Sequence, residues 1–273
     1  MRFTFHPYTP DSRGTKLVKY DTHPHPQDGN QHVLRVCCSP EIERQIEALA
    51  GGAASKGTLT DASAEQFTAG YLFGEPVSDD LLNFLELLKS VVTLTQRDRI
   101  DIATSLDWYK VGEDSGELRN TGMGQCVNHT KHAPFPNGRG SKAAWRLMCE
   151  SMIAFVQGHP FYAAAGIVTA PPGHLADGNS WGERLAKEVA RATGKPYVSM
   201  KGSGPRPERK DADNADLDLT DEFTLDQRMD GHRVIIIDDV FHTGTTLDAA
   251  ASACREAGAV EVLTATVART LRK

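Results

Sequence analysis

The sequence lacks any apolar stretch that approaches the roughly 18 residues of a membrane-spanning helix, and its first residues contain no apolar signal core. Its five cysteines are odd in number, and no two of them have the C-x-x-C spacing. These absences argue against a membrane protein and against a small protein held together by disulfide bonds. We therefore expect a cytoplasmic protein with reduced thiols.

An excess of positive charge is also absent. The chain has 30 Lys and Arg residues against 36 Asp and Glu residues, which gives a formal net charge of −6. This balance disfavours a nucleic-acid binder that relies on bulk positive charge, although a local basic patch stays compatible with it. The length of 273 residues suits one large domain, or one medium domain with an extension.

Two common phosphate-binding signatures are missing as well. The sequence has no G-x-x-x-x-G-K-[ST] loop and no G-x-G-x-x-G fingerprint after a strand pattern. Cys126, His129 and His132 do have a C-x-x-H-x-x-H spacing that could contribute to a zinc site. A structural zinc site needs a fourth ligand, and no candidate stands nearby. Whether these three residues bind a metal stays open at this point.

The pattern of apolar residues changes near residue 98. Before it, short helices are predicted over residues 41–50, 61–74 and 78–94. After it, predicted strands alternate with predicted helices. The strands cover residues 99–109, 163–170, 197–200, 233–238 and 260–268, and the helices cover 141–158, 180–194 and 245–258. The alternation predicts an α/β domain over residues 98–273, with a mainly parallel sheet flanked by helices. A small, mostly helical N-terminal extension is predicted over residues 1–97.

The clearest chemistry lies in VIIIDDVFHTGTT, residues 234–246. The run of apolar residues predicts a central strand, so Asp238 and Asp239 fall at its carboxyl end, where open α/β sheets bind ligands. Carboxylates can accept hydrogen bonds from vicinal sugar hydroxyls. The Thr- and Gly-rich loop leads into a helix, whose unpaired N–H groups favour phosphate. The spacing therefore predicts a ribose 5-phosphate site. The alternative is a strand–turn–helix in which threonines merely cap the helix.

This stretch resembles the phosphoribosyl pyrophosphate (PRPP) binding motif of type I phosphoribosyltransferases. The resemblance covers roughly residues 98–270. Together with GIVTAPPGHLADGNSWGERLAKEVARATGKPYV, it is most similar to the ComF-like branch, which is linked to DNA uptake. The chain departs from this branch in two ways. It has no Cys-rich zinc module of the kind that many members carry, and His242 replaces the usual small hydroxyl residue.

The resemblance implies a role for each part of the motif. The paired acids, Asp238 and Asp239, hold the ribose 2′ and 3′ hydroxyls and contact Mg²⁺, which is bound largely through PRPP. The residues of the 5-phosphate loop are His242, Thr243, Gly244, Thr245 and Thr246. Asp239 and His242 are candidate catalytic residues, and the imidazole could handle a proton of the acceptor. The alternative is that His242 only shapes the loop or donates to phosphate.

Two further segments are implied to contact the pyrophosphate. One is the loop at residues 170–174, through Pro171, Pro172 and Gly173, for which a simple turn is the alternative. The other is the charged stretch at residues 201–222, which matches the flexible hood of the family. Three basic residues there could meet the departing pyrophosphate: Arg206, Arg209 and Lys210. Arg209 is also a candidate catalytic residue. A solvated surface loop is the alternative. In ComF-like chains a basic segment precedes the first long helix, which implies that Lys131 and His132 lie near the substrate entrance.

The implied activity is that of a Mg²⁺-dependent pentosyltransferase. Such an enzyme transfers the 5-phosphoribosyl group of PRPP to a nitrogenous acceptor, a nucleobase or related heterocycle, and releases pyrophosphate. Three alternatives stay open: a non-catalytic sensor of PRPP or a nucleotide, a DNA-uptake accessory protein, and hydrolysis of a ribose phosphate. The acceptor, the role of the N-terminal extension and the formation of a homodimer cannot be read from the residues.

Overall fold

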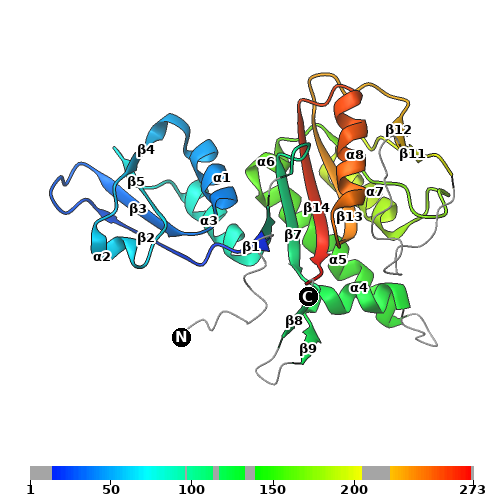
Figure 1. Cartoon of the computed structure of the whole chain (residues 1–273), viewed down its shortest axis with the longest axis horizontal. Coiled ribbons are helices and arrows are strands. Elements are labelled where there is room, and N and C mark those ends of the chain that lie inside the picture. The colour runs from blue at the N-terminus through cyan, green and yellow to red at the C-terminus, as the bar shows by residue number, and fades with distance from the viewer. Residues whose placement is uncertain (1–13, 96, 113–116, 133–138, 205–221, 272–273) are drawn as a thin grey trace. The chain divides into compact units, whose positions relative to one another are not determined.

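The computed structural model describes residues 14–95, 97–112, 117–132, 139–204 and 222–271. For His132 and residues 139–141 it describes the backbone alone. The chain divides into two compact units, and within the described residues the first ends at Thr95 and the second begins after it. Each unit is described by itself below (Figure 1).

The second unit is built on parallel strands in the order β7-β14-β13-β10. Their bounds are Ile102–Trp108 for β7, Ile167–Thr169 for β10, Arg233–Phe241 for β13 and Glu261–Arg269 for β14. The register places Ile235 between Val168 and Leu263 of the two neighbouring strands. Tyr197 forms a further parallel bridge with Val168. The predicted α/β class with a mainly parallel sheet is confirmed.

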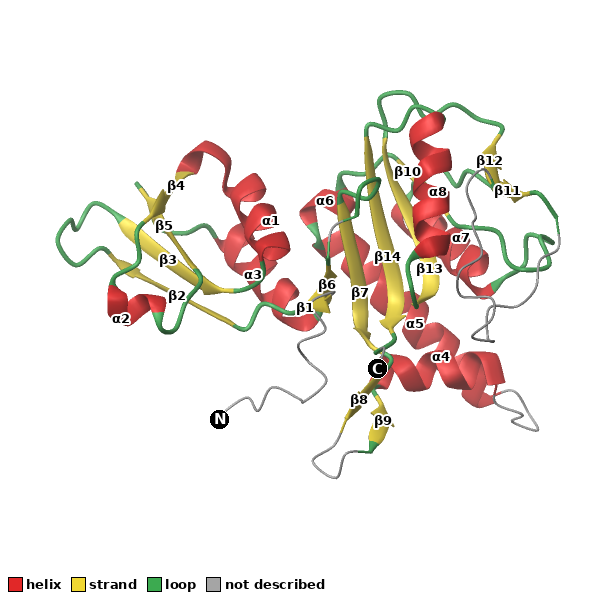
Figure 2. Ribbon diagram, in the orientation of Figure 1, coloured by secondary structure: helices red, strands yellow, loops and turns green. Residues whose placement is uncertain are grey.

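Helices cover both faces of this sheet. Figure 2 shows α8 in front of the strands and α5 behind them. The helices are α4 (Gly122–His132), α5 (Arg139–Gly158), α6 (Pro160–Ala163), α7 (Trp181–Thr193) and α8 (Thr245–Glu256). Two small antiparallel hairpins complete the unit. One pairs β8 (Lys110–Gly112) with β9 (Leu118–Asn120), and the other pairs β11 (Met200–Gly202) with β12 (Phe223–Leu225).

The central strand β13 forms the core of the unit, as the continuous apolar run predicts. Val234, Ile235, Ile236 and Ile237 are all 0 % exposed. An apolar side chain at every one of four consecutive positions requires apolar cover on both faces of the sheet, since successive strand side chains point to opposite faces. The helices on the two faces supply that cover.

The substitution Ile236→Ala tests this role of β13. Removing a fully buried branched side chain deletes apolar contacts and leaves a cavity, so we expect a loss of about 2–5 kcal/mol in the free energy of unfolding. Urea denaturation followed by circular dichroism measures it. Val260→Ala is the matched control, because Val260 is 61 % exposed and should change stability by no more than about 0.5 kcal/mol.

The first unit has an antiparallel sheet in the order β2-β3-β5-β4, with the strands β1 and β6 paired separately. Strand bounds are Gly14–Thr15 for β1, Lys19–Pro24 for β2, His32–Cys37 for β3, Ala54–Gly57 for β4, Ala69–Phe73 for β5 and Val92–Leu94 for β6. Helices are α1 (Pro40–Ala50), the short 3₁₀ helix η1 (Gly51–Ala53), α2 (Asp61–Ala64) and α3 (Asp79–Ser90).

The prediction of a mostly helical extension is therefore wrong. Residues 69–73 and 92–94, predicted as helix, are strands β5 and β6. In β3, Leu34 and Val36 are both 0 % exposed and alternate with less buried neighbours, which is the two-residue period of a strand. The predicted helices near residues 41–50 and 78–90 are present, and Ser78 caps α3 by accepting a hydrogen bond from the amide of Leu81.

Among the described residues, no helix has both the length and the apolar character required to cross a membrane.

Candidate active site

The site is formed where two neighbouring strands end. Because β10 and β13 are adjacent and parallel, their carboxyl ends meet at one edge of the sheet. The loop at residues 170–180 joins β10 to α7, and residues 242–244 join β13 to α8. Gly182, in the first turn of α7, lies against Asp238, because a Cβ atom on this glycine would be 2.7 Å from Asp238 Oδ1. The packing thus brings the start of α7 to the acidic pair.

The acidic pair consists of Asp238 and Asp239 near the end of β13. Asp238 Oδ1 accepts a hydrogen bond of 2.8 Å from the amide of Asp239. Asp239 Oδ2 lies 2.6 Å from Lys131 Nζ, and the side chains of Asp239 and Lys131 are 14 % and 29 % exposed. The second carboxylate is therefore largely buried and paired with a cation from the last turn of α4.

The ammonium group of Lys131 stays charged in this setting. Burial is the largest influence and lowers its pKa, but the charge of Asp239 and the hydrogen bond to it, with a smaller contribution from Asp238, raise the pKa above the ordinary value. The Tyr109 side chain makes the smallest contribution and also raises this pKa. The site therefore combines two carboxylates with one fixed positive charge.

The loop after the acids turns through Gly244, the N-cap of α8, which has φ 85° and ψ −8°. Glycine adopts this left-handed conformation without the steric cost that a Cβ atom brings. Thr243 Oγ1 lies 2.8 Å from Thr245 Oγ1 and accepts a hydrogen bond of 3.3 Å from the amide of Thr245. The first amides of α8 follow this turn, with Thr246 half-buried beside them. The loop thus presents hydroxyl and amide donors at a helix N-terminus, which suits phosphate.

His242 begins this loop and its side chain is exposed. Its Nδ1 atom lies 3.2 Å from Thr270 Oγ1. Its carbonyl oxygen accepts a hydrogen bond from the guanidinium group of Arg269. Arg269 is 1 % exposed, and its guanidinium carbon lies over the ring of Phe241, 4.7 Å from the ring centroid. The backbone at His242 is therefore held by a buried arginine, while its side chain is exposed to solvent.

Arg97 holds the same loop from the other side. Its Nε atom lies 2.7 Å from both carboxylate oxygens of Asp248, and its Nη1 atom donates to the carbonyl oxygen of Thr243 at 2.9 Å. The amide of Asp248 in turn donates to the carbonyl oxygen of Gly244 at 2.8 Å. Arg97 therefore connects the first turn of α8 to the residue before its cap.

Sequence reasoning did not identify Arg97, Arg269 or the ion pair of Lys131. Arg97 and Asp248 are 151 positions apart, so no local pattern joins them. Arg269 did carry a signal, since it is a charged residue that directly follows the apolar run of the last strand.

The proline-bearing loop packs against the start of α7. Pro171 and Pro172 are buried, and the amide of Gly173 donates to Glu183 Oε2 at 3.3 Å. Glu183 is 1 % exposed and completes a capping box with Ser180, as the sequence predicts. A Cβ atom on Gly202 of β11 would lie 3.3 Å from Pro172 Cγ, so the base of the β11–β12 hairpin adjoins this loop. Contact between the loop and pyrophosphate stays a prediction.

The structure does not show the remaining predicted residues at the acidic pair or the phosphate loop. Arg206, Arg209 and Lys210 lie outside the described residues, in the part of the sequence that follows β11 and precedes β12. The thiol of Cys126 is buried. Within the described part of the chain, no group of three or more His, Cys, Asp or Glu side chains could hold a metal ion, and the side chain of His132 is not part of that description.

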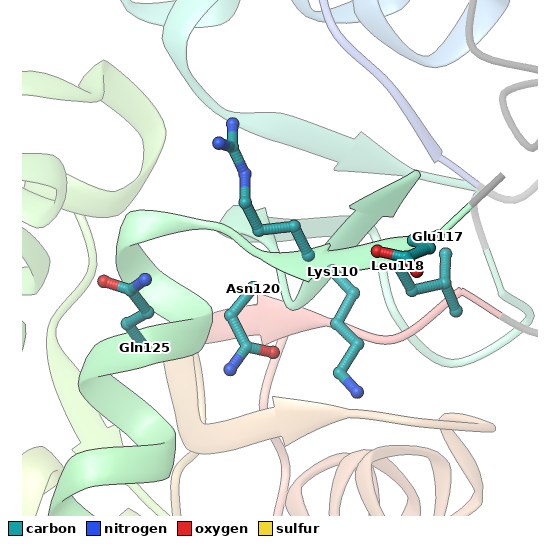
Figure 3. A pocket seen from close by; sticks show the side chains of 6 residues that line it. Lys110, Glu117, Leu118, Asn120 and Gln125 are labelled. Atoms are coloured by element: carbon teal, nitrogen blue, oxygen red, sulfur yellow. The ribbon is translucent and has the colours of Figure 1, made fainter. Parts of the chain in front are cut away.

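A polar pocket of about 390 Å³ lies between the β8–β9 hairpin and the start of α4. Figure 3 shows the side chains of Lys110 and Asn120 on the hairpin and that of Gln125 on the helix. Charged and amide groups dominate its lining, which is Lys110, Glu117, Leu118, Arg119, Asn120 and Gln125. Tyr109 directly precedes this hairpin in the sequence.

Part of the second unit matches a family model. Residues 180–273 match the family model of the phosphoribosyl transferase domain. Among solved structures, the chain is similar to a purine phosphoribosyltransferase from Pyrococcus horikoshii Ot3, with 16 % identity over 45 % of this chain and 83 % of that one, and a TM-score of 0.32. It is also similar to an orotate phosphoribosyltransferase from Aeropyrum pernix, with 20 % identity over 57 % of this chain and 70 % of that one, and a TM-score of 0.32.

No curated protein matches the chain. These comparisons do not address the ComF-like branch, which stays a prediction. The family match does include the acidic pair, the Gly244 loop and α8. The resemblance read from the motif is therefore confirmed over residues 180–273, which are similar to the phosphoribosyl transferase domain.

Proposed function

We propose that the second unit transfers the 5-phosphoribosyl group of PRPP to a nitrogenous acceptor, a nucleobase or related heterocycle, and releases pyrophosphate. One observation carries the proposal. The acidic pair lies at the carboxyl end of β13, and the left-handed turn at Gly244 follows at once and opens α8. The match to the phosphoribosyl transferase domain over residues 180–273 supports the same reading.

The two parts of the site suit the two ends of a ribose 5-phosphate. Carboxylates accept hydrogen bonds only, so Asp238 and Asp239 would accept them from the 2′ and 3′ hydroxyls. The amides that follow Gly244 and the hydroxyl groups of Thr243 and Thr245 would donate to the 5-phosphate. Hydrogen bonds in which one group is charged are the stronger kind, so both ends would contribute to the affinity.

The residues at this site also fit Mg²⁺, which prefers oxygen ligands and usually combines one or two carboxylates with substrate phosphates. Asp238 and Asp239 would hold the ion, largely through PRPP. When bound, it would neutralise charge on the departing pyrophosphate. The protein's own residues would orient the sugar and fix the phosphate, which places the anomeric carbon for attack.

The reaction is a displacement at that carbon. The lone pair of the acceptor nitrogen forms the new bond to carbon, the bond to the pyrophosphate oxygen breaks, and its electron pair leaves with pyrophosphate. The nitrogen then loses a proton, which the exposed imidazole of His242 would take. Asp239 would stabilise positive charge on the sugar, and Arg209 would meet the leaving group.

The substitution Arg97→Lys tests whether the contacts of Arg97 with Asp248 and Thr243, called the clamp below, support the binding of PRPP. Lysine keeps the charge but lacks the planar fork that contacts Asp248 and the Thr243 carbonyl together. We expect PRPP affinity measured by calorimetry to fall by about tenfold, or about 1.4 kcal/mol. The melting temperature should change little, because both side chains are about a third exposed.

Arg191→Lys on α7 is the matched control for this substitution. Arg191 forms a comparable pair with Glu188 on the surface of the helix, with its own side chain 75 % exposed. Its replacement should leave PRPP affinity unchanged. Equal affinity of the Arg97→Lys variant and the unmodified protein would show that the clamp does not support the phosphate loop.

Release of pyrophosphate from PRPP tests the proposed function. The protein is incubated with PRPP and Mg²⁺ and with a panel of purine and pyrimidine bases, including carboxylated ones. We expect release that depends on one class of base. Release without any base would instead indicate hydrolysis, and binding without release would indicate a sensor. Absence of both binding and release would contradict the proposal.

A further inference from the structure

We propose that Lys131 is a positioning residue that balances the charge of the acidic pair so that a polyanionic sugar phosphate can bind there. The inference rests on the proposed function. Its starting point is the 2.6 Å contact between Lys131 Nζ and Asp239 Oδ2. PRPP carries several negative phosphate charges, and two adjacent carboxylates would repel them. A cation fixed on one carboxylate reduces this repulsion at the point where the sugar must lie.

The fold delivers Lys131 to this point through α4. The start of the helix is locked to the end of β7, because Gly124 packs so closely on the Tyr109 carbonyl oxygen that an added Cβ atom would lie 1.9 Å from it. Thr121 Oγ1 accepts a hydrogen bond of 3.0 Å from the amide of Gly124. Val127 and Thr130 on the helix are 1 % and 7 % exposed. A helix anchored in this way holds its last turn in one place.

The chemistry of the ammonium group suits a bridging role. Lysine has three N–H donors and no acceptor. One donor is used by Asp239, so others can face substrate oxygens. The two arginine side chains near the site have other partners. Arg97 contacts Asp248, and Arg269 donates to the carbonyl oxygen of His242. Lys131, by contrast, forms its ion pair with Asp239 of the acidic pair.

Lys131 and Mg²⁺ would supply positive charge to the same place. The contribution of Lys131 should therefore be greatest when Mg²⁺ is scarce. A purely structural lysine has no reason to show this dependence. The opposite effect is also conceivable in physical terms, since a sugar hydroxyl would compete with Nζ for Asp239 Oδ2. The direction of the change in affinity thus distinguishes charge balance from competition.

Calorimetry with PRPP at low and at saturating Mg²⁺ tests the inference, using Lys131→Gln, Lys131→Met and Lys131→Arg. Glutamine keeps a donor for Asp239 and removes the charge. We expect about tenfold weaker binding for the Gln and Met variants at low Mg²⁺, or about 1.4 kcal/mol, and a smaller loss at saturating Mg²⁺. The Arg variant should restore most of the affinity. In turnover, KM for PRPP should rise while kcat changes little.

Lys142→Gln is the matched control, because Lys142 lies exposed on α5. Thermal melting establishes that each variant is folded before binding is compared, and the Gln variant keeps the test valid if the Met variant does not fold. If the unmodified protein gives no heat with PRPP, the proposed function itself fails. If it binds PRPP, and Lys131→Gln binds equally well or more tightly at low Mg²⁺, the role of Lys131 alone is overturned.

Discussion

Replacing Asp238 and Asp239 together with asparagine is expected to abolish PRPP binding and pyrophosphate release. Each carboxylate would lose a charge-assisted hydrogen bond to a sugar hydroxyl, worth about 1.5–3 kcal/mol. Two such losses correspond to a drop in affinity of about 100-fold to 10,000-fold. Calorimetry with PRPP and Mg²⁺ measures the first effect, and a pyrophosphate assay measures the second.

Folding must be separated from binding in this variant, because asparagine leaves the partly exposed Lys131 without its ion-pair partner. We expect the melting temperature to fall by a few degrees while the protein stays folded. Asp230→Asn is the matched control. Asp230 precedes the opposite end of β13 and forms its ion pair with Arg228 at the surface. Binding that persists in the double variant would remove the acids from the sugar site.

Gly244→Ala is expected to have the second-largest effect, because it changes the phosphate loop in two ways. The residue has φ +85°, and an added Cβ atom would lie 2.6 Å from Phe241 Cζ and 2.7 Å from Arg97 Nη1. A left-handed backbone costs a residue other than glycine about 1–3 kcal/mol. The close contacts would also displace the loop from its amide-donating geometry. We expect PRPP affinity to fall by about 100-fold, which is about 2.7 kcal/mol.

Gly231→Ala separates backbone strain from the effect on the site. Gly231 has φ +73°, and an added Cβ atom there meets nothing within 4 Å. This residue precedes β13 at the edge away from the acids. We expect it to lower the melting temperature and leave PRPP binding intact. Equal losses of binding in the two variants would show that Gly244 acts through overall stability alone.

The sequence was sufficient to predict the elements whose patterns are local. The four-residue apolar run of β13, the capping box of α7 and the Gly at the start of α8 each combine a hydrophobic period with a terminal signal. The predicted roles of the acids and of the phosphate loop come from one stretch of thirteen residues, 234–246, and they stay predictions.

Features that depend on distant partners could not be predicted in the same way. Strand β5 is short, AGYLF, and its conformation is fixed by pairing with β3 and β4 on both sides. Its apolar residues fit a helix or a strand equally well until those partners are known. The contact of Lys131 with Asp239 joins α4 to β13, more than a hundred residues apart, and likewise has no local signature.

A crystal structure of the protein with PRPP and Mg²⁺ tests the central claim most directly. The account predicts the 5-phosphate against the amides that follow Gly244, and the ribose hydroxyls within hydrogen-bonding distance of Asp238 and Asp239. Lys131 should lie between Asp239 and a substrate oxygen. Density for PRPP elsewhere on the chain, or a loop at residues 242–246 closed against the sheet so that no phosphate can reach its amides, would contradict it.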